Sequence, residues 1–400
     1  MKRLLFAVAL CSCMMQVFNS CRDAGLETEG LNTHRTGVQY VFDLSNVADN
    51  KPDTMFVLAN RILGLWKSSM KVSTSNGKGI YLYNPQNMVW GNPDSVATVT
   101  DTLSRYYLNS GDFKFLAFTY GADELDYSGV DSFMINDEAT TSELYVKYNL
   151  YTLDSLVAVL KNDKNRERYL NWTDRNIYKD SKKTYIRPSA TAICRDVLEM
   201  QSLNDGKNKT LRFTPKRVTQ KIDLSFEISK VFSDTTKFVI KEAFAEISGI
   251  PVRLDLVTGY IDITETGKMM FPVTISKDNL SNKTVKCTAS IDVPTIVPGS
   301  SDHATRGPGI LQLIIYYEDK YGRSNKKQTK INLYSLITTK SGGKTVPLLY
   351  SFTNDGLHAI KKGDNPKINV TVPPINESDG SESKEEMSTW VDEQPVMIHI

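Results

Sequence analysis

Histidine, the side chain most used for proton transfer near neutral pH, is scarce in this sequence. The four histidines, His34, His303, His358 and His399, lie far apart along the chain. No Gly-x-Ser-x-Gly, His-Glu-x-x-His or glycine-rich phosphate-binding motif occurs. The residue types needed for hydrolytic or phosphoryl-transfer chemistry are therefore poorly supplied, and we expect no enzymatic activity.

Carboxylates could serve acid–base chemistry or bind calcium. Asp126, Asp131 and Asp137 are the best candidates, but their spacing does not match a calcium-binding loop. We interpret these residues as solvated loop positions and expect no metal and no cofactor.

Cysteine thiols offer a third kind of chemistry, and the chain has five of them. Cys11, Cys13 and Cys21 lie near the start, so only Cys194 and Cys287 remain in the body. Two cysteines cannot complete a zinc site. An exported protein can form a disulfide, but we favour two separate buried thiols because we place these residues in different domains.

The first residues have the pattern of a secretory signal. Lys2 and Arg3 are followed by an apolar run over 4–18, which is too short to span a membrane, and then by Ser20 and Cys21. The segment Phe18-Asn19-Ser20-Cys21 resembles the lipobox of bacterial lipoproteins, although Phe18 and Asn19 depart from its usual residues. The resemblance implies a signal peptide over 1–20 and a Cys21 that carries acyl chains such as palmitate.

Two other readings of this segment stay open: a plain signal peptide with a chance cysteine, and an uncleaved anchor helix. The polar residues that follow favour lipidation, because they are typical of a flexible tether, which we place at 21–36. Two or three acyl chains would attach the protein stably to a membrane.

The composition is that of a globular protein. The 400 residues are 40% hydrophobic and 24% charged, which excludes collagen-like and wholly disordered chains. This length favours two domains over one. Since 48 basic residues face 46 acidic ones, there is no electrostatic case for a nucleic-acid partner.

Period-two alternation of apolar and polar residues dominates the body and predicts antiparallel strands with one buried and one wet face. Val38, Tyr40 and Phe42 share one face of a first strand, and Phe113, Phe115, Ala117 and Thr119 share one face of another. The clearest hairpin joins 310–317 to 327–333 through a turn with Asp319 and Gly322. Further strands are expected at 210–214, 218–228, 237–247, 269–275, 284–293 and 368–372. The pattern predicts an all-β protein of sandwich domains.

Helical spacing is found once. Leu153, Leu156, Val157 and Leu160 follow the i, i+3, i+4, i+7 pattern, with Thr152 or Asp154 as a cap, and predict one minor helix. The segment 190–200 fits either a helix or a strand.

A polar, turn-forming stretch at 201–210 marks the domain boundary. We therefore place an N-terminal sandwich at 37–205 and a C-terminal sandwich at 206–400. After a second polar stretch at 376–386, a terminal strand is expected at 389–400, with Trp390, Val396, Ile398 and Ile400 as its apolar residues. Such a strand can close its own sheet or pair with another chain.

Several of these segments together resemble the fimbrillin superfamily, the minor and anchor subunits of type V fimbriae and related surface lipoproteins. The resemblance rests on the Cys21 lipobox, the Gly111-Asp112-Phe113-Lys114-Phe115-Leu116-Ala117-Phe118 strand, the Ala245-Glu246-Ile247-Ser248-Gly249-Ile250 segment and the strand from Trp390 to Ile400. It implies two tandem transthyretin-like β-sandwiches, a lipid anchor in the outer membrane, partners among other fimbrial subunits, and assembly by strand complementation.

In polymerising members of that family an Arg-specific protease removes the lipidated segment and the first strand, whereas anchor members keep both. Arg35 and Arg61 are the possible cleavage points here. A cut at Arg35 would leave residues 38–44 in place and open no groove. The sequence therefore favours an anchored or accessory subunit over a stalk subunit.

A second hypothesis is a monomeric surface lipoprotein that binds glycans. Tyr81, Tyr83 and Trp90 lie in a region rich in Gly, Asn and Pro, where a loop could present rings to sugars. The favoured interpretation is that Trp66 and Trp90 are core anchors, which a β-sandwich of this size needs. The basic cluster of Arg323, Lys326, Lys327 and Lys330 is better explained as a solvated turn or a lysine-protected strand edge than as a phosphate site.

Overall fold

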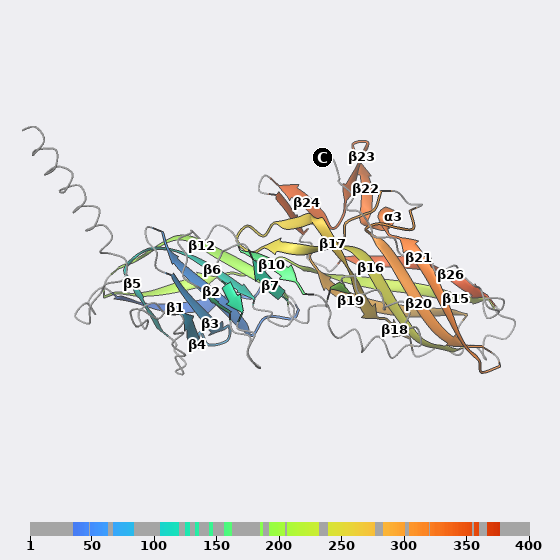
Figure 1. The fold of residues 1–400 in the computed structure, drawn as a ribbon, viewed down its shortest axis with the longest axis horizontal. Helices are drawn as coiled ribbons and strands as arrows, with labels where there is room; N and C mark the ends of the chain where they lie inside the picture. Colours follow the sequence, from blue (N-terminus) through green and yellow to red (C-terminus); the bar gives the residue numbers. More distant parts are fainter. Residues whose placement is uncertain are drawn as a thin grey trace, which may run out of the picture. The chain divides into compact units, whose positions relative to one another are not determined.

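A computed structural model describes most of the body of the chain (Figure 1). The described residues are 35–47, 49–62, 67–83, 105–119, 125–128, 133–135, 144–146, 156–161, 185–186, 192–204, 206–231, 239–276, 283–300, 304–319, 321–353, 356–359 and 366–376. The leader, Cys21 and the terminal segment 389–400 lie outside these ranges. Within them, no helix is both long enough and apolar enough to cross a bilayer.

Nearly all regular structure in the described ranges is β, which confirms the predicted all-β class. The one helix found there is α3 (Tyr334–Ile337), a single turn. The chain forms two compact units. Of the described residues, the first unit holds those from 35 to 119, from 127 to 156 and from 193 to 217, and the second holds 125–126, those from 157 to 192 and those from 218 to 376. The division therefore does not fall at one point near residue 205, because 157–192 belong to the second unit and 206–217 to the first.

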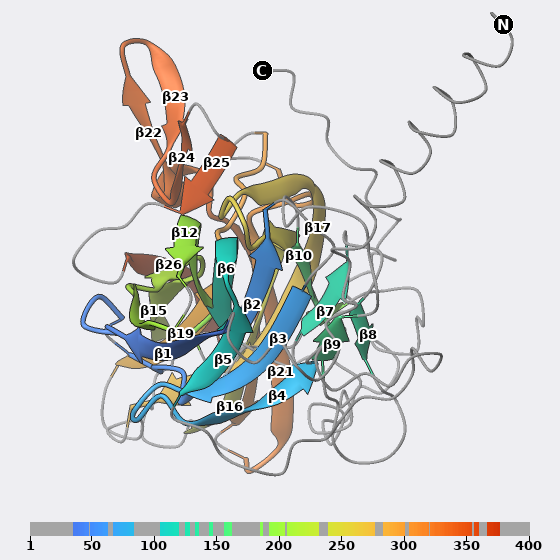
Figure 2. The same cartoon turned by 90° about the vertical axis from the view of Figure 1, so that its left-hand side faces the viewer.

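The first unit contains a three-stranded sheet and a six-stranded sheet. The three-stranded sheet has the order β13 (Asn208–Phe213), β1 (Arg35–Phe42), β5 (Tyr106–Asn109). The six-stranded sheet has the order β14 (Lys216–Arg217), β12 (Cys194–Leu203), β6 (Gly111–Thr119), β2 (Thr54–Arg61), β3 (Lys67–Ser73), β4 (Gly79–Tyr83), and most of its strands are seen side by side in Figure 2. A separate pair joins β8 (Phe133–Ile135) to β9 (Leu144–Val146).

The two sheets of the first unit meet in an aromatic core. The Tyr40 ring of β1 lies 6.3 Å from the Phe115 ring of β6, centroid to centroid. Phe113, Phe115, Ala117 and Thr119 are all buried, as their shared face predicted. The opposite face of β6 is polar only at its start, where Asp112 is exposed and Lys114 is half-buried. Further along, Leu116 and Phe118 are buried too, and Phe118 packs on Phe56 of β2 at 5.9 Å.

The second unit also has two main sheets. One has the order β18 (Thr274–Ile275), β19 (Thr284–Val293), β15 (Gln220–Val231), β26 (Lys367–Asn376). The other has the order β11 (Tyr185–Ile186), β17 (Ile261–Pro272), β16 (Val239–Asp255), β10 (Val157–Leu160), β7 (Leu125–Ser128), with β20 (Ile310–Glu318) paired to β16 and β21 (Ser324–Asn332) to β20.

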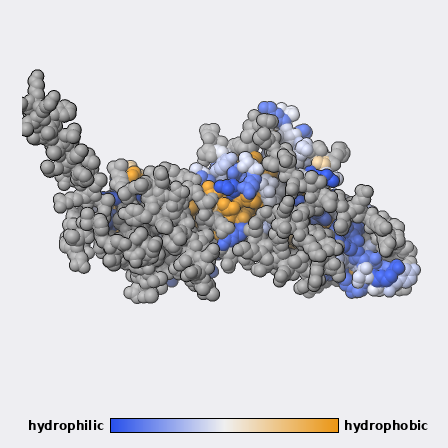
Figure 3. Space-filling model, in the orientation of Figure 1, coloured by the Kyte–Doolittle hydropathy of each residue, from blue (hydrophilic) through white to orange (hydrophobic). Residues whose placement is uncertain are grey.

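Two small hairpins complete the second unit. They are β22 (Thr338–Ser341) with β23 (Lys344–Pro347), and β24 (Tyr350–Thr353) with β25 (Gly356–Ala359). Figure 3 shows a hydrophilic surface at the tip of β22 and β23, where Lys340, Ser341 and Lys344 are exposed.

Most predicted strands are confirmed. The hairpin of β20 and β21 turns through Asp319, whose carboxylate accepts hydrogen bonds from the backbone N–H groups of Tyr321 and Arg323. Gly322 follows with a φ of +73°, which glycine adopts at little cost. The open segment 190–200 is a strand from Cys194 onward.

The predicted minor helix is wrong where the structure describes it. Residues 157–160 form β10, which pairs antiparallel with Arg253–Asp255 of β16. Ala158 and Leu160 alternate with the half-buried Val157 and Val159, so the apolar residues there also satisfy a period of two. Leu153, Thr152 and Asp154 lie outside the described residues.

Cys194 and Cys287 are both free and buried, one in each unit, which confirms two separate thiols. Burial raises the pKa of the Cys287 thiol to about 11, because the thiolate would lose its hydration.

We predict that neither thiol reacts quickly with a disulfide reagent such as Ellman's reagent at pH 8 in the folded chain from residue 22 onward. The thiolate is the attacking species, and the raised pKa leaves little of it at Cys287. Denaturation should release both thiols. Rapid reaction of the native protein, or thiols that react in the denatured protein only after a reductant is added, would contradict the assignment.

Candidate functional site: the slot filled by the first strand

The position of β1 makes the first strand the candidate functional element. Residues Gly37–Phe42 pair in parallel with Asn208–Phe213 of β13, and Arg35–Val38 pair antiparallel with Tyr106–Asn109 of β5. β1 therefore satisfies backbone groups on two neighbouring strands at once. We call the space that β1 fills between β5 and β13 the β1 slot.

The side chains of β1 that face the core are held mainly by aromatic rings. Tyr40 is buried, and its ring lies 5.0 Å from that of Tyr106 and 6.0 Å from that of Phe213. Phe42 stacks on Phe213 at 5.4 Å. Such ring pairs contribute about 0.5–1.5 kcal/mol each beyond the area they bury. The β1 slot is thus an apolar trough lined by rings.

Both ends of β1 are fixed by further hydrogen bonds. At its start, Thr36 Oγ1 donates to the carbonyl oxygen of Asn204 at 2.6 Å, and the Gly37 N–H donates to that of Lys207 at 3.2 Å. Just past its end, the Asp43 N–H donates to the carbonyl oxygen of Phe213 at 2.8 Å. Loss of β1 would leave all these acceptors, and the facing edges of β5 and β13, without partners.

Arg35 is the first residue of β1 and is paired with Asn109. The predicted tether at 21–36 therefore overlaps the strand, since Arg35 and Thr36 already belong to the sheet. An arginine in a paired strand is a poor protease substrate, because a protease needs several residues of extended, unpaired chain.

Arg61 is the last residue of β2, which pairs with β3 on one side and β6 on the other. Arg61 lies opposite Phe113, and its guanidinium covers Gly111: a Cβ built on Gly111 would stand 2.7 Å from Arg61 Nε. Gly111 has a φ of +142°, where the chain leaves β5 for β6. Both predicted cleavage points are therefore built into sheets.

The other predicted site residues fall outside the described part of the chain. These are Cys21 and the terminal Trp390, Val396, Ile398 and Ile400. Trp66 and Trp90 also lie outside it; Tyr81 and Tyr83 belong to β4.

The basic cluster does mark a strand edge. In the described part of its sheet, β21 pairs with β20 alone. Arg323 is bridged to Asp319 at 2.7 Å, and Lys327 Nζ donates to the carbonyl oxygen of Pro374 at 2.9 Å. Charged side chains on an edge hinder pairing with other chains, as expected for a protected edge.

A buried polar group in the second unit was missed by sequence reasoning. Tyr185 Oη donates to Glu246 Oε2 at 2.8 Å, and Lys268 Nζ lies 3.8 Å from Glu246 Oε1. Glu246 lies between two apolar neighbours, which signals a strand, but nothing in the sequence predicts Tyr185 as its partner. The contact ties β11 to β16, so we assign it a structural role.

No group of three or more metal-ligating side chains occurs among the described residues. A shallow groove of about 420 Å³ lies on the second unit, over β15, β18, β19 and β26. Its polar lining consists of Asp223, Ser225, Thr274, Thr288, Ser290, Lys367 and Asn369.

No protein-family model matches the sequence. No curated protein matches it. Solved structures that are similar include an adhesin candidate from Bacteroides ovatus, at 11% identity and a TM-score of 0.43, over 86% of this chain and 94% of that one.

Two further solved structures are similar over most of their length. The fimbrial anchor protein Mfa2 from Porphyromonas gingivalis aligns with 82% of this chain and 100% of its own, at 11% identity and a TM-score of 0.34. A candidate polysaccharide-binding protein from Bacteroides thetaiotaomicron aligns with 82% and 99%, at 12% identity and a TM-score of 0.34.

We predict that Tyr40→Ala lowers the free energy of unfolding of the first unit by about 3–5 kcal/mol, because it empties the centre of the ring cluster. The matched control is Gln39→Ala, on the exposed face of the same strand, which should change it by about 0.5 kcal/mol or less. Urea unfolding of the chain from residue 22 measures both. Equal effects of the two substitutions would contradict the role given to the β1 slot.

Proposed function

We propose that this chain is a non-enzymatic minor or anchor subunit of a fimbria-like surface assembly, with a structural and adhesive role. Acyl chains on Cys21 hold it in the outer membrane, with the folded body at the cell surface. Other fimbrial subunits are its partners. The chain keeps β1 in its slot, so that the lipid and the body stay connected.

The place of β1 is the observation that carries this proposal. An anchor must transmit force from its lipid to its folded body, and β1 is the first described element after Cys21. Because β1 is paired on both sides, pulling on its start loads two ladders of hydrogen bonds and the ring cluster together. Arg35 and Arg61, where cleavage would break the connection, both lie in paired strands.

Strand complementation is the proposed means of pairing with neighbours. The alternating residues Val396, Ile398 and Ile400 suit a strand that enters an apolar trough. β26 also offers an acceptor edge, since in the described part of its sheet it is paired with β15 alone. Pro373 and Pro374 lie in β26, and proline is tolerated at such an edge.

One observation favours a second candidate, a monomeric surface lipoprotein that binds glycans. The groove over β15, β18, β19 and β26 is lined by hydroxyl, amide and charged groups, which suit sugar hydroxyls. Within this groove the Ser290 hydroxyl donates to Asp223 Oδ1 at 2.8 Å. A glycan array distinguishes the two candidates, since a binder gives a signal that Asp223→Ala and Asn369→Ala remove.

We predict that cells fed a clickable palmitate analogue label this chain, and that Cys21→Ser abolishes the label. The proposal places every acyl chain on Cys21, on a glyceryl group bound to its sulfur and on its amino group. Cys194→Ser is the matched control and should keep the label, because Cys194 is buried. An unlabelled wild-type chain, or a label that survives Cys21→Ser, would refute the anchor.

A further inference from the structure

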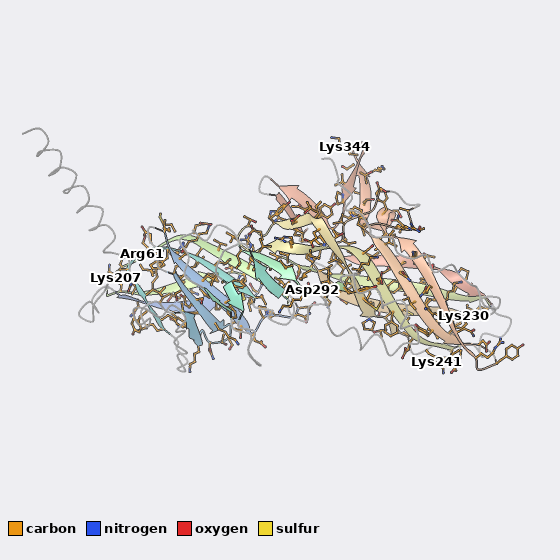
Figure 4. The ribbon with its side chains drawn as sticks, viewed as in Figure 1. Arg61, Lys207, Lys230, Lys241, Asp292 and Lys344 are labelled. Carbon is orange, nitrogen blue, oxygen red and sulfur yellow. The ribbon has the colours of Figure 1, made fainter. Side chains whose placement is uncertain are left out.

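The end of the first unit where β1 begins gathers segments that are distant in sequence. We call it the tether end; it comprises Arg35–Gly37, Arg61–Ile62, Arg105–Asp112, Glu199–Asn204 and Gly206–Lys209. Strand pairing brings Arg35 to Asn109, and Leu203 to Gly111. Figure 4 shows Arg61 and Lys207 together at this end.

Exposed apolar side chains are concentrated at the tether end. Among the described residues of the first unit, the large hydrophobic side chains that are exposed are Ile62, Tyr107 and Met200, at 38%, 51% and 67%. Tyr107 lies opposite Gly37, and the Ile62 N–H donates to the carbonyl oxygen of Asp112 at 2.9 Å. Met200 lies in a bulge of β12 next to Gln201, which pairs with Phe113. Tyr107 belongs to the three-stranded sheet, Met200 belongs to the six-stranded sheet and Ile62 directly follows β2 of that sheet, and all three lie within a few residues of this end of their sheets. Exposed apolar groups of this kind are typical of an interaction surface.

The same end is rich in basic groups. Arg105 and Lys207 are exposed, and Arg61 and Lys209 are half-exposed. Arg105 reaches over Gly37, within 2.9 Å of where a Cβ would stand. Lys209 Nζ donates to the carbonyl oxygen of Ser202 at 3.0 Å.

Fewer acidic groups oppose these charges. Glu199 is bridged to Lys114 at 3.3 Å, and Asp112 accepts a hydrogen bond from the Ser202 hydroxyl at 2.6 Å. Asp205 also belongs to this stretch of sequence but lies outside the described residues. The basic groups outnumber these carboxylates, so the tether end suits an anionic partner.

The chain that enters β1 sets how far this end lies from the proposed lipid. The segment from Cys21 to Arg35 can reach at most about 50 Å, whatever its conformation. Acylation at Cys21 would therefore hold the tether end near the bilayer at a high effective concentration. Even weak contacts would then be populated.

We infer that the tether end is a membrane-docking surface for the anionic headgroups of the bilayer that holds the acyl chains. This inference rests on the proposed lipidation of Cys21. Ile62, Tyr107 and Met200 enter the headgroup region, where tyrosine rings are favoured, and the basic side chains contact the headgroup phosphates. Docking would limit the directions in which the first unit can point from the membrane.

Vesicle flotation of the non-acylated chain from Arg22 to Ile400, which contains every described residue, tests this surface. The vesicles are phosphatidylcholine with or without phosphatidylglycerol. We expect binding to the anionic vesicles that weakens as salt is raised. The triple substitution Ile62→Ser, Tyr107→Ser and Met200→Ser should lower the partition coefficient by about tenfold or more.

The second unit supplies a matched control. Tyr321, Leu336 and Val346 are exposed to 69%, 39% and 39%, and their replacement by serine should leave binding unchanged. Charge is tested in the same way: Lys207→Glu should weaken anionic binding by about fivefold or more, whereas Lys344→Glu, at the tip of β22 and β23, should not.

No binding by the wild-type chain, or equal loss in both triple variants, would overturn the docking surface. That result is separable from failure of the anchor. If cells label Cys21 with the palmitate analogue but the purified chain does not bind vesicles, docking alone is refuted. If cells do not label Cys21 but the purified chain binds anionic vesicles, the anchor is refuted and the binding surface is supported.

Discussion

The pairing of β1 with two strands at once is the interaction on which the first unit depends. β5 and β13 come from distant parts of the chain, and in the described sheet neither has another partner than β1. The ring of Tyr40 then joins this small sheet to Phe115 of the larger one. Without β1, a three-stranded layer would become two isolated edges over an uncovered aromatic core.

This constraint connects the fold to the proposed role. A strand that completes a core cannot leave without a large loss of stability, so the unit is built to stay closed. The same strand is the continuation of the segment that follows Cys21. A lipid on that residue would pull along a strand fixed on both sides, while the basic and apolar groups around its start would face the bilayer. The proposed anchoring and the proposed docking would thus both act where β1 begins.

The sequence predicted where the strands lie better than it predicted which strands pair with one another. Alternation located β19 and the hairpin of β20 and β21, because period two and an Asp/Gly turn are local signals. It could not show that β1 pairs in parallel with β13, since alternation defines faces and not partners. The helix expected around Val157 was wrong because a short apolar run fits both periods, and pairing with β16 decided between them. The burial of both faces in the second half of β6 could have been predicted, because Leu116 and Phe118 are apolar residues on the second face.

For the candidate site, the sequence identified Arg35 and Arg61 but not their places in paired strands. It gave no sign of the contact between Tyr185 and Glu246.

The mass and N-terminal residue of the mature protein, isolated from the surface of the cells that make it, test the central claim most directly. The account predicts a single species that begins at acylated Cys21 and contains all of β1. A mature chain that begins at Thr36 would have lost the lipid, and one that begins at Ile62 would also lack β1 and have an empty slot; either result would contradict the account.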